Sequence, residues 1–250
     1  APTHGRVEIF GHPLQEHLRF VLDHTGAMVE EPAFYPYLSG WDNLAIMAHT
    51  AGLGTRADIG GVLKLVDLAG RGRDKFKTYS QGMKQRLAIA AALLNDPELI
   101  FLDEPTNGLD PAGMVGIRGL IRRLGEVGKT VFLSSHLLHE VEQVCNRVAI
   151  VQKGSVVVQG PVKQLLHGKE EIEIYIDQRE PAVAALRELD WLKVETPSTT
   201  SHIVVQAPVS RSAEVNAHLA RRGLFASQIV ARRQSLEQYF LDVTGGEQHV

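Results

Sequence analysis

The chain has 250 residues, which is long enough for one large core and a smaller second unit. Hydrophobic residues make up 44 % and charged residues 22 %, a composition typical of a globular protein. Its 26 basic and 29 acidic residues give a net charge of −3, which argues against nucleic acid as a partner. The single cysteine, Cys145, excludes an internal disulfide and suits a reducing compartment. Because no apolar run approaches the roughly 20 residues of a membrane helix, any membrane part is expected to come from a partner.

The first third of the chain predicts a short strand followed by helices. Val7 and Ile9 alternate with polar residues, which indicates a half-buried strand before a Gly-His-Pro turn. Residues 20–36 predict a strand or turn that leads into an acidic and aromatic loop. Ser39 is expected to begin a capping box for the next helix, and a further helix is expected over about residues 56–68.

Residues 80–110 read SQGMKQRLAIAAALLNDPELIFLDEPTNGLD, and the rest of the chain is organised around them. Ser80 can cap a helix that Asp96-Pro97 would end, and its expected buried face is formed by Met83, Leu87, Ala90 and Leu94. Residues 99–102 predict a parallel strand that is buried on both faces. Asp103 and Glu104 follow it at the carboxyl edge, where open α/β sheets bind their ligands.

Three motifs in this stretch resemble those of the ABC-type ATPases. Ser80-Gln81-Gly82-Met83-Lys84 resembles the signature motif of that family, although Ser-Gly-Gly-Gln is more usual. Residues 99–104 resemble its Walker B strand, and Gly108-Leu109-Asp110 resembles its D-loop. A helix is expected over residues 112–127 and a strand over 130–134, and His136 just beyond that strand resembles the switch histidine of the family.

The resemblance implies an α/β fold, the P-loop NTPase fold of ABC type with a helical subdomain, followed by a small C-terminal α+β domain. We expect the ATPase domain over residues 1–167, with its helical subdomain at about 37–95, and an accessory domain over 168–250. Strands and helices alternate as βαββαβ in the accessory domain, which predicts a ferredoxin-like arrangement and a regulatory or dimer-stabilising role.

A P-loop, G-x-x-x-x-G-K-[ST], is absent from this sequence. Gly128-Lys129-Thr130 matches only the end of that pattern, because Arg123 stands at the first glycine and a strand follows where a helix is required. In this interpretation the sequence begins just after the Walker A helix of the family, so that the P-loop belongs to an upstream segment.

The loop at Glu30 resembles the Q-loop of the family. When the loop is aligned through Gly26, Pro32 and Tyr35-Pro36, the glutamine position falls on Glu30. A carboxylate there can coordinate Mg²⁺ or orient water, and the family branch with Glu resembles exporters of peptide antibiotics such as lantibiotics and bacitracin. An acidic surface loop without function is the alternative.

The resemblance assigns roles to the remaining motif residues. Asp103, with Glu30, is expected to hold Mg²⁺, and Glu104 to act as the general base that polarises the attacking water. His136 would hydrogen-bond the γ-phosphate of ATP. Ser80, Gln81 and Gly82, together with Asp110, would meet the ATP bound to a second ATPase subunit in a head-to-tail dimer.

The resulting hypothesis is the ATP-hydrolysing subunit of an ABC exporter at the cytoplasmic face of the membrane, with ATP and Mg²⁺ as cofactors and separate permeases as partners. Its aromatic loop, Phe34-Tyr35-Pro36-Tyr37, would face the permeases, and the second ATPase subunit is either an identical or a different chain. The alternatives are a non-catalytic partner that donates only the signature motif, and a soluble ABC ATPase that acts on DNA or ribosomes. The soluble ABC ATPase is disfavoured because the sequence has neither a long heptad run nor a second core.

Overall fold

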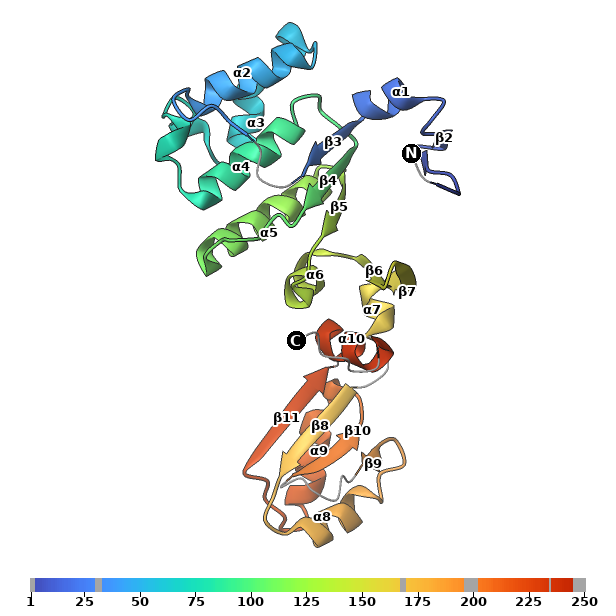
Figure 1. Cartoon of the computed structure of the whole chain (residues 1–250). Coiled ribbons are helices and arrows are strands. Elements are labelled where there is room, and N and C mark those ends of the chain that lie inside the picture. Colours follow the sequence, from blue (N-terminus) through green and yellow to red (C-terminus); the bar gives the residue numbers. More distant parts are fainter. Residues whose placement is uncertain (1–2, 30–32, 167–169, 196–201, 234, 245–250) are drawn as a thin grey trace. The chain divides into compact units, whose positions relative to one another are not determined.

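The computed structural model describes residues 3–29, 33–166, 170–195, 202–233 and 235–244 and is mixed α/β (Figure 1). The chain divides into two compact units, Ala1–Glu140 and Val141–Val250. The division precedes the predicted boundary at 167/168, which lies outside the described residues. The C-terminal helix α10 (Leu236–Thr244) contacts the beginning of the second unit. There the Leu236 amide donates a hydrogen bond to Glu142 Oε2 over 3.0 Å. The predicted domain limits remain a prediction.

The first unit combines helices with a parallel sheet. Its helices are α1 (Leu18–Asp23), α2 (Gly40–Thr50), α3 (Ile59–Leu65), α4 (Gln81–Ala92) and α5 (Pro111–Glu126), and α6 (Leu138–Val144) crosses into the second unit. Its strands are the hairpin β1 (Glu8–Ile9) and β2 (His12–Pro13) and the parallel strands β3 (Thr25–Met28), β4 (Leu99–Asp103) and β5 (Thr130–Ser134), in the order β3-β4-β5. The mixed α/β fold agrees with the prediction.

Polar side chains begin the helices that carry the predicted motifs. Ser39 and Ser80 accept hydrogen bonds from the third amide of α2 and of α4, over 3.0 and 3.3 Å, which confirms both predicted caps. Asp110 caps α5 in the same way, accepting from the Gly113 amide over 2.8 Å. Each cap therefore satisfies one backbone donor in the first turn of its helix.

The predicted end of α4 was wrong. The helix stops at Ala92, and Leu94 and Asp96-Pro97 lie beyond it. The end of the helix packs against Gly26 of β3, where an added Cβ would lie 1.9 Å from the Ala92 carbonyl oxygen. The helix expected over residues 56–68 is likewise shorter, and α3 lies between the 3₁₀ turns Gly54–Arg56 and Ala69–Arg71.

The central strand β4 is buried on one face only, so the expectation of burial on both faces was wrong. Ile100 and Leu102 are 0 % and 1 % exposed. Phe101, on the opposite face, is only partly buried beside Phe132 of β5, which is 63 % exposed. α4 packs on the Ile100 side, against Gly26, which is the register partner of Ile100.

The second unit begins with a hairpin and continues as a small α+β domain. The hairpin joins β6 (Arg147–Gln152) and β7 (Ser155–Pro161) through Lys153 and Gly154 at φ of 50° and 78°, as a two-residue turn of this kind requires. The following elements are α7 (Val162–Leu165), β8 (Glu170–Tyr175), α8 (Arg179–Leu186), β9 (Lys193–Glu195), β10 (Ile203–Gln206), α9 (Ser212–Ala220), β11 (Gln228–Arg233) and α10.

The four strands β8 to β11 confirm the ferredoxin-like prediction. Their order in the sheet is β11-β8-β10-β9, every neighbouring pair is antiparallel, and α8 and α9 follow β8 and β10 in sequence. One core unites the sheet with both helices, and it includes Ile172, Ile174, Ile203, Val205, Leu186, Val215 and Leu219. This domain therefore encloses a hydrophobic core of its own.

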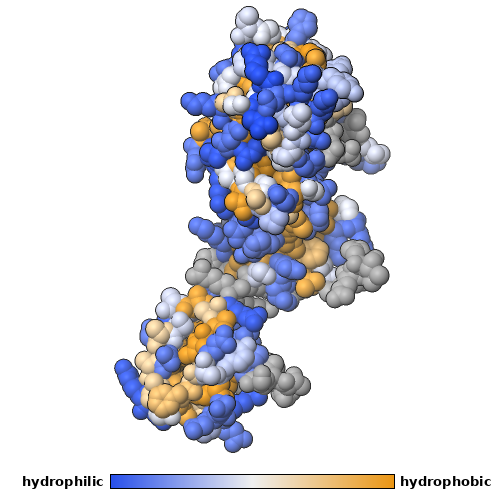
Figure 2. All heavy atoms as spheres, turned by 90° about the vertical axis from the view of Figure 1, so that its left-hand side faces the viewer, coloured by the Kyte–Doolittle hydropathy of each residue, from blue (hydrophilic) through white to orange (hydrophobic). Residues whose placement is uncertain are grey.

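Apolar side chains also reach the surface. Figure 2 shows one side of the molecule, on which apolar residues lie among hydrophilic ones. In the chain as a whole, large exposed hydrophobic residues include Phe132 and Val29 in the first unit and Phe225 in the second. Within the described ranges, no helix combines the length and apolar character needed to cross a bilayer.

Candidate active site

The carboxyl ends of β4 and β5 bring the predicted acidic residues together with a serine. Asp103 and Ser134 are register partners at the last positions of the two parallel strands. The Ser134 hydroxyl donates a hydrogen bond of 2.5 Å to Asp103 Oδ1, and Ser134 Oγ accepts a bond of 3.0 Å from the Glu104 amide. Ser134 therefore fixes the Asp103 side chain and the backbone from which Glu104 projects.

Glu104 and His136 form the second contact of this edge. Glu104 has φ of 45°, a left-handed conformation that is unusual for a residue with a side chain and costs conformational energy. Its Oε2 lies 3.0 Å from His136 Nδ1, and the two side chains are 32 % and 63 % exposed. Oε2 itself is buried and makes no hydrogen bond within the protein, so its one close polar neighbour in the described contacts is the imidazole.

The donor set at this edge fits a hard cation in part. Asp103 is exposed, and its carboxylate and the hydroxyl of Ser134 are oxygen donors of the kind that Mg²⁺ prefers. In the described part of the chain, no group of three or more His, Cys, Asp or Glu side chains is arranged to enclose a metal ion. Glu30, the other predicted ligand, lies outside the described residues.

A second group of predicted residues lies where α4 and α5 begin. The exposed residues Ser80 and Asp110 cap these helices, and Gln81 and Gly82 form the first turn of α4. A Cβ added at Gly82 would be 4.0 Å from the Cα of Gly113, so the two helix starts lie side by side. Their N-terminal amides point the positive ends of two helix dipoles towards the same region, which favours an anion there.

The aromatic loop before α2 is fastened by a buried asparagine. Asn43 is 2 % exposed; its Oδ1 accepts from the Tyr35 amide over 2.7 Å, and its Nδ2 donates to the Tyr35 carbonyl over 3.1 Å. Tyr35 and Tyr37 remain 59 % and 72 % exposed, and the Lys77 ammonium lies 5.2 Å from the centre of the Tyr37 ring. Asn43 therefore fixes the loop backbone at Tyr35, while both aromatic rings remain exposed to solvent.

The sequence of this chain is similar to those of known proteins. A family model described as ABC transporter matches residues 1–107. An uncharacterized ABC transporter ATP-binding protein of Bacillus subtilis, YdbJ, is 38 % identical over 248 residues, which cover 98 % of this chain and 79 % of that protein. This chain belongs to the family of ABC transporter ATP-binding proteins.

Two further likenesses agree with this membership. The bacitracin transport ATP-binding protein BcrA of Enterococcus faecalis is 34 % identical over 247 residues, covering 98 % of this chain and 80 % of the relative. A solved structure titled as the ATP-binding subunit of an ABC transporter matches with a TM-score of 0.55 and 27 % identity over 66 % of this chain and 70 % of that chain. The ABC family and its α/β fold, predicted from the signature, Walker B and D-loop motifs, are thus confirmed.

Two residues that hold predicted functional residues in place were not singled out by the sequence: Ser134 at the acidic edge and Asn43 at the aromatic loop. Ser134 was taken only as the end of a strand, although its register opposite Asp103 follows once both strands are aligned at their carboxyl ends. Asn43 was taken only as a residue of the helix after Ser39. Its position gave no signal, because the loop that it holds lies eight residues earlier in the chain.

Proposed function

We propose that this chain is the ATP-hydrolysing subunit of an ABC exporter. The observation that carries the proposal is the contact of Glu104 with His136 beside Asp103, at the carboxyl edge of a parallel sheet. Membership of the ABC ATP-binding family supports ATP as the substrate. Hydrolysis of ATP requires an oriented water and stabilisation of phosphate charge, and these residues can supply both.

The acidic residues would divide the chemistry between them. Asp103, held by Ser134, and Glu30 would hold Mg²⁺, which when bound neutralises charge on the phosphates. Glu104 would take a proton from water as the water oxygen attacks the γ-phosphorus and the bond to the leaving ADP oxygen breaks. His136 would keep the carboxylate in position and donate a hydrogen bond to the γ-phosphate. The strained backbone at Glu104 is consistent with a residue placed for function rather than for stability.

The second group of residues would complete the site of a neighbouring subunit. Ser80, Gln81 and Gly82 at the start of α4, with Asp110 at the start of α5, offer helix N-termini suited to a γ-phosphate. A head-to-tail dimer would bring them to ATP held by the other chain, which is identical or different. Closing and opening of that dimer would drive transport.

The membrane partners would be separate permease subunits that dock on the aromatic loop at Tyr35 and Tyr37 from the cytoplasmic side. The exposure of these rings and the hydrogen bonds from Asn43 to the loop backbone at Tyr35 support such a docking surface. The relative BcrA is a bacitracin transport ATP-binding protein, which supports a peptide antibiotic or drug as the cargo. The accessory domain, expected at 168–250, would stabilise or regulate the dimer.

Replacement of Glu104 tests the proposal in the protein as its own host makes it. Glu104→Gln should lower kcat for ATP by about 100-fold or more while ATP affinity is retained and the dimer persists. Glu126→Gln, which changes an exposed carboxylate at the end of α5, is the matched control and should keep normal turnover.

Normal turnover of the Glu104→Gln variant would contradict the general-base role. A wild-type protein that hydrolyses no ATP by itself but activates a different ATPase subunit would instead favour the non-catalytic partner that donates only its signature motif. Resistance of the host to bacitracin and related peptides, measured with and without the gene, tests the cargo separately.

A further inference from the structure

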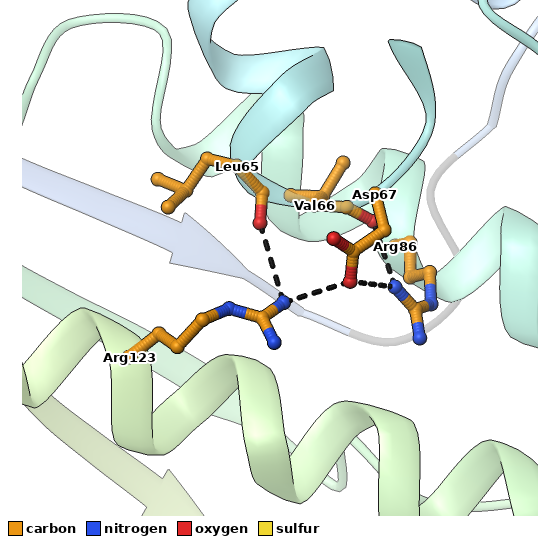
Figure 3. Close-up of polar contacts among 5 residues, drawn as sticks. All are labelled: Leu65, Val66, Asp67, Arg86 and Arg123. Atoms are coloured by element: carbon orange, nitrogen blue, oxygen red, sulfur yellow. Dashed lines mark hydrogen bonds and ion pairs between the residues drawn. The ribbon is translucent and has the colours of Figure 1, made fainter. Parts of the chain in front are cut away.

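The carboxylate of Asp67 joins three helices of the first unit. Asp67 follows the end of α3 and has φ of 59°, the left-handed conformation. Its Oδ2 accepts a hydrogen bond of 2.6 Å from Arg86 of α4 and another of 2.8 Å from Arg123 of α5 (Figure 3). One oxygen atom thus bridges two arginines that are 37 residues apart in sequence, one from each helix.

Both arginines also bind the carbonyl end of α3. Arg86 Nη1 donates to the Val66 carbonyl over 2.9 Å, and Arg123 Nη2 donates to the Leu65 carbonyl over 3.4 Å (Figure 3). These carbonyls belong to the negative end of the helix dipole, where a positive charge is favourable. Each guanidinium therefore holds a carboxylate and a helix end at once, which fixes it more firmly than a single surface ion pair.

Electrostatics favour the ionised carboxylate. Burial raises the pKa of Asp67, but the hydrogen bonds and charges of Arg86 and Arg123 outweigh it, so the pKa lies below its ordinary value. The side chains of Arg86, Arg123 and Asp67 are 21 %, 42 % and 56 % exposed, so water screens the contact of Arg86 least. The bridge is intact at neutral pH and persists into the acidic range.

Glycines let α4 and α5 approach each other closely between the Asp67 bridge and the starts of the two helices. A Cβ added at Gly116 of α5 would lie 2.5 Å from Arg86 Nη2, so the guanidinium lies across the backbone of α5 where a side chain is missing. Further towards the helix starts, Gly82 faces Gly113. The packing of α4 on α5 is thus continuous from the Asp67 bridge to Ser80 and Asp110.

We propose that Asp67 is a positioning residue, which through Arg86 and Arg123 holds α4 against α5 so that the helix starts at Ser80 and Asp110 move as one body. The inference rests on the proposed function, because those two starts are the groups expected to meet the ATP of the neighbouring subunit. Asp67 itself touches no reacting atom. Its effect on catalysis is therefore expected in turnover and in the coupling of the two helices, with little change in the affinity of the chain for its own ATP.

The turnover test compares Asp67→Asn with Asp74→Asn in the native protein. Asp74 also forms an ion pair with an arginine, Arg71, and in the described contacts this pair does not involve α5. Asp74→Asn is therefore the matched control. We expect Asp67→Asn to lower kcat by about fivefold with KM for ATP changed by less than about twofold, and Asp67→Glu to restore most of the rate. Arg123→Gln should have a similar effect, and the double variant Asp67→Asn/Arg123→Gln should be no slower than the slower single variant.

Hydrogen exchange gives a readout that does not need turnover. In Asp67→Asn, amides of residues 80–86 and 110–116 should exchange faster together, whereas Asp74→Asn should leave both segments unchanged. Additive losses in the double variant, an unchanged kcat in Asp67→Asn, or faster exchange confined to the end of α3 would each overturn the inference. If the wild-type protein has no ATPase activity, the proposed function fails and hydrogen exchange alone decides whether Asp67 couples the two helices.

Discussion

The two sheets of this protein use their acidic residues in opposite ways. In the parallel sheet β3-β4-β5, Asp103 is the last residue of strand β4 and Glu104 follows it, and both side chains remain accessible to solvent. In the antiparallel sheet β11-β8-β10-β9, Glu173 lies in the middle of β8 and is 7 % exposed. Its carboxylate accepts from Tyr175 over 3.1 Å and pairs with Arg232 over 2.8 Å.

The difference shows that the position of a carboxylate relative to the end of its strand distinguishes a candidate catalytic residue from a structural one. A carboxylate within a strand is surrounded by cross-strand neighbours, which neutralise it and leave no room for a ligand. A carboxylate beyond the strand end projects into solvent, and its orientation depends on a few contacts, here Ser134 and His136. Four substitutions would break or sharpen this comparison.

The largest effect is expected from the core of the second unit. Ile174 on β8 is 0 % exposed, so Ile174→Ala should lower the free energy of unfolding of this unit by about 2–5 kcal/mol. Val156→Ala, at a valine that is 58 % exposed, should change it by less than about 0.5 kcal/mol. Denaturant titration of the native protein measures both. An equal loss of stability in the two variants would show that the second unit does not depend on this core.

The next effect concerns the site itself. His136→Ala removes the imidazole 3.0 Å from Glu104 and should lower kcat for ATP by about 100-fold, with stability nearly unchanged because His136 is exposed. His139→Ala, three residues later and also exposed, is the control. Steady-state ATPase assays decide, and a rate equal to that of the control would remove His136 from the mechanism.

A smaller effect is expected from the serine that holds the acidic edge. Ser134→Ala removes the hydrogen bonds to Asp103 Oδ1 and from the Glu104 amide, so kcat should fall by about tenfold. The Mg²⁺ concentration that gives half-maximal rate should rise as well, because Asp103 loses its fixed orientation. Ser134→Thr, which keeps a hydroxyl, should restore part of the rate, and an unchanged Mg²⁺ dependence in the alanine variant would argue against the role of Asp103 as a ligand.

The smallest effect concerns the structural acid Glu173. Its hydrogen bond with Tyr175, followed by burial and the charge of Glu173, raises the pKa of the Tyr175 phenol. The stability that this contact gives is present at neutral pH and is lost as the pH rises through the elevated pKa of the folded state, above the ordinary value of about 10. Glu173→Gln should lower the pKa of Tyr175, seen in an absorbance titration of tyrosinate.

Tyr79 provides the internal control for that titration. Its pKa is raised chiefly by burial and also by the charge of Asp74, so Glu173→Gln should leave it unchanged. Equal shifts of both tyrosines would point to a general loosening of the fold instead of the loss of one contact.

Much of the local structure was predictable because it depends on neighbouring residues. The caps at Ser39 and Ser80 follow from a polar side chain before an apolar repeat, and the bounds of β5 agree with the expected 130–134. The end of α4 was misplaced because the packing of its last turn on Gly26 comes from a strand 66 residues earlier.

The sequence by itself determined the ABC family, the alternation of elements and the identity of the acidic residues, since ordered motifs and apolar periodicity are local properties. Only the tertiary structure decided that Ser134 orients Asp103, that Glu104 meets His136, and that Asp67 joins α4 to α5. The contacts of Ser134 and His136 join residues that are about 30 positions apart, and those of Asp67 span 19 and 56 positions. All of them depend on strand register or helix packing. A single sequence carries no direct record of such pairings.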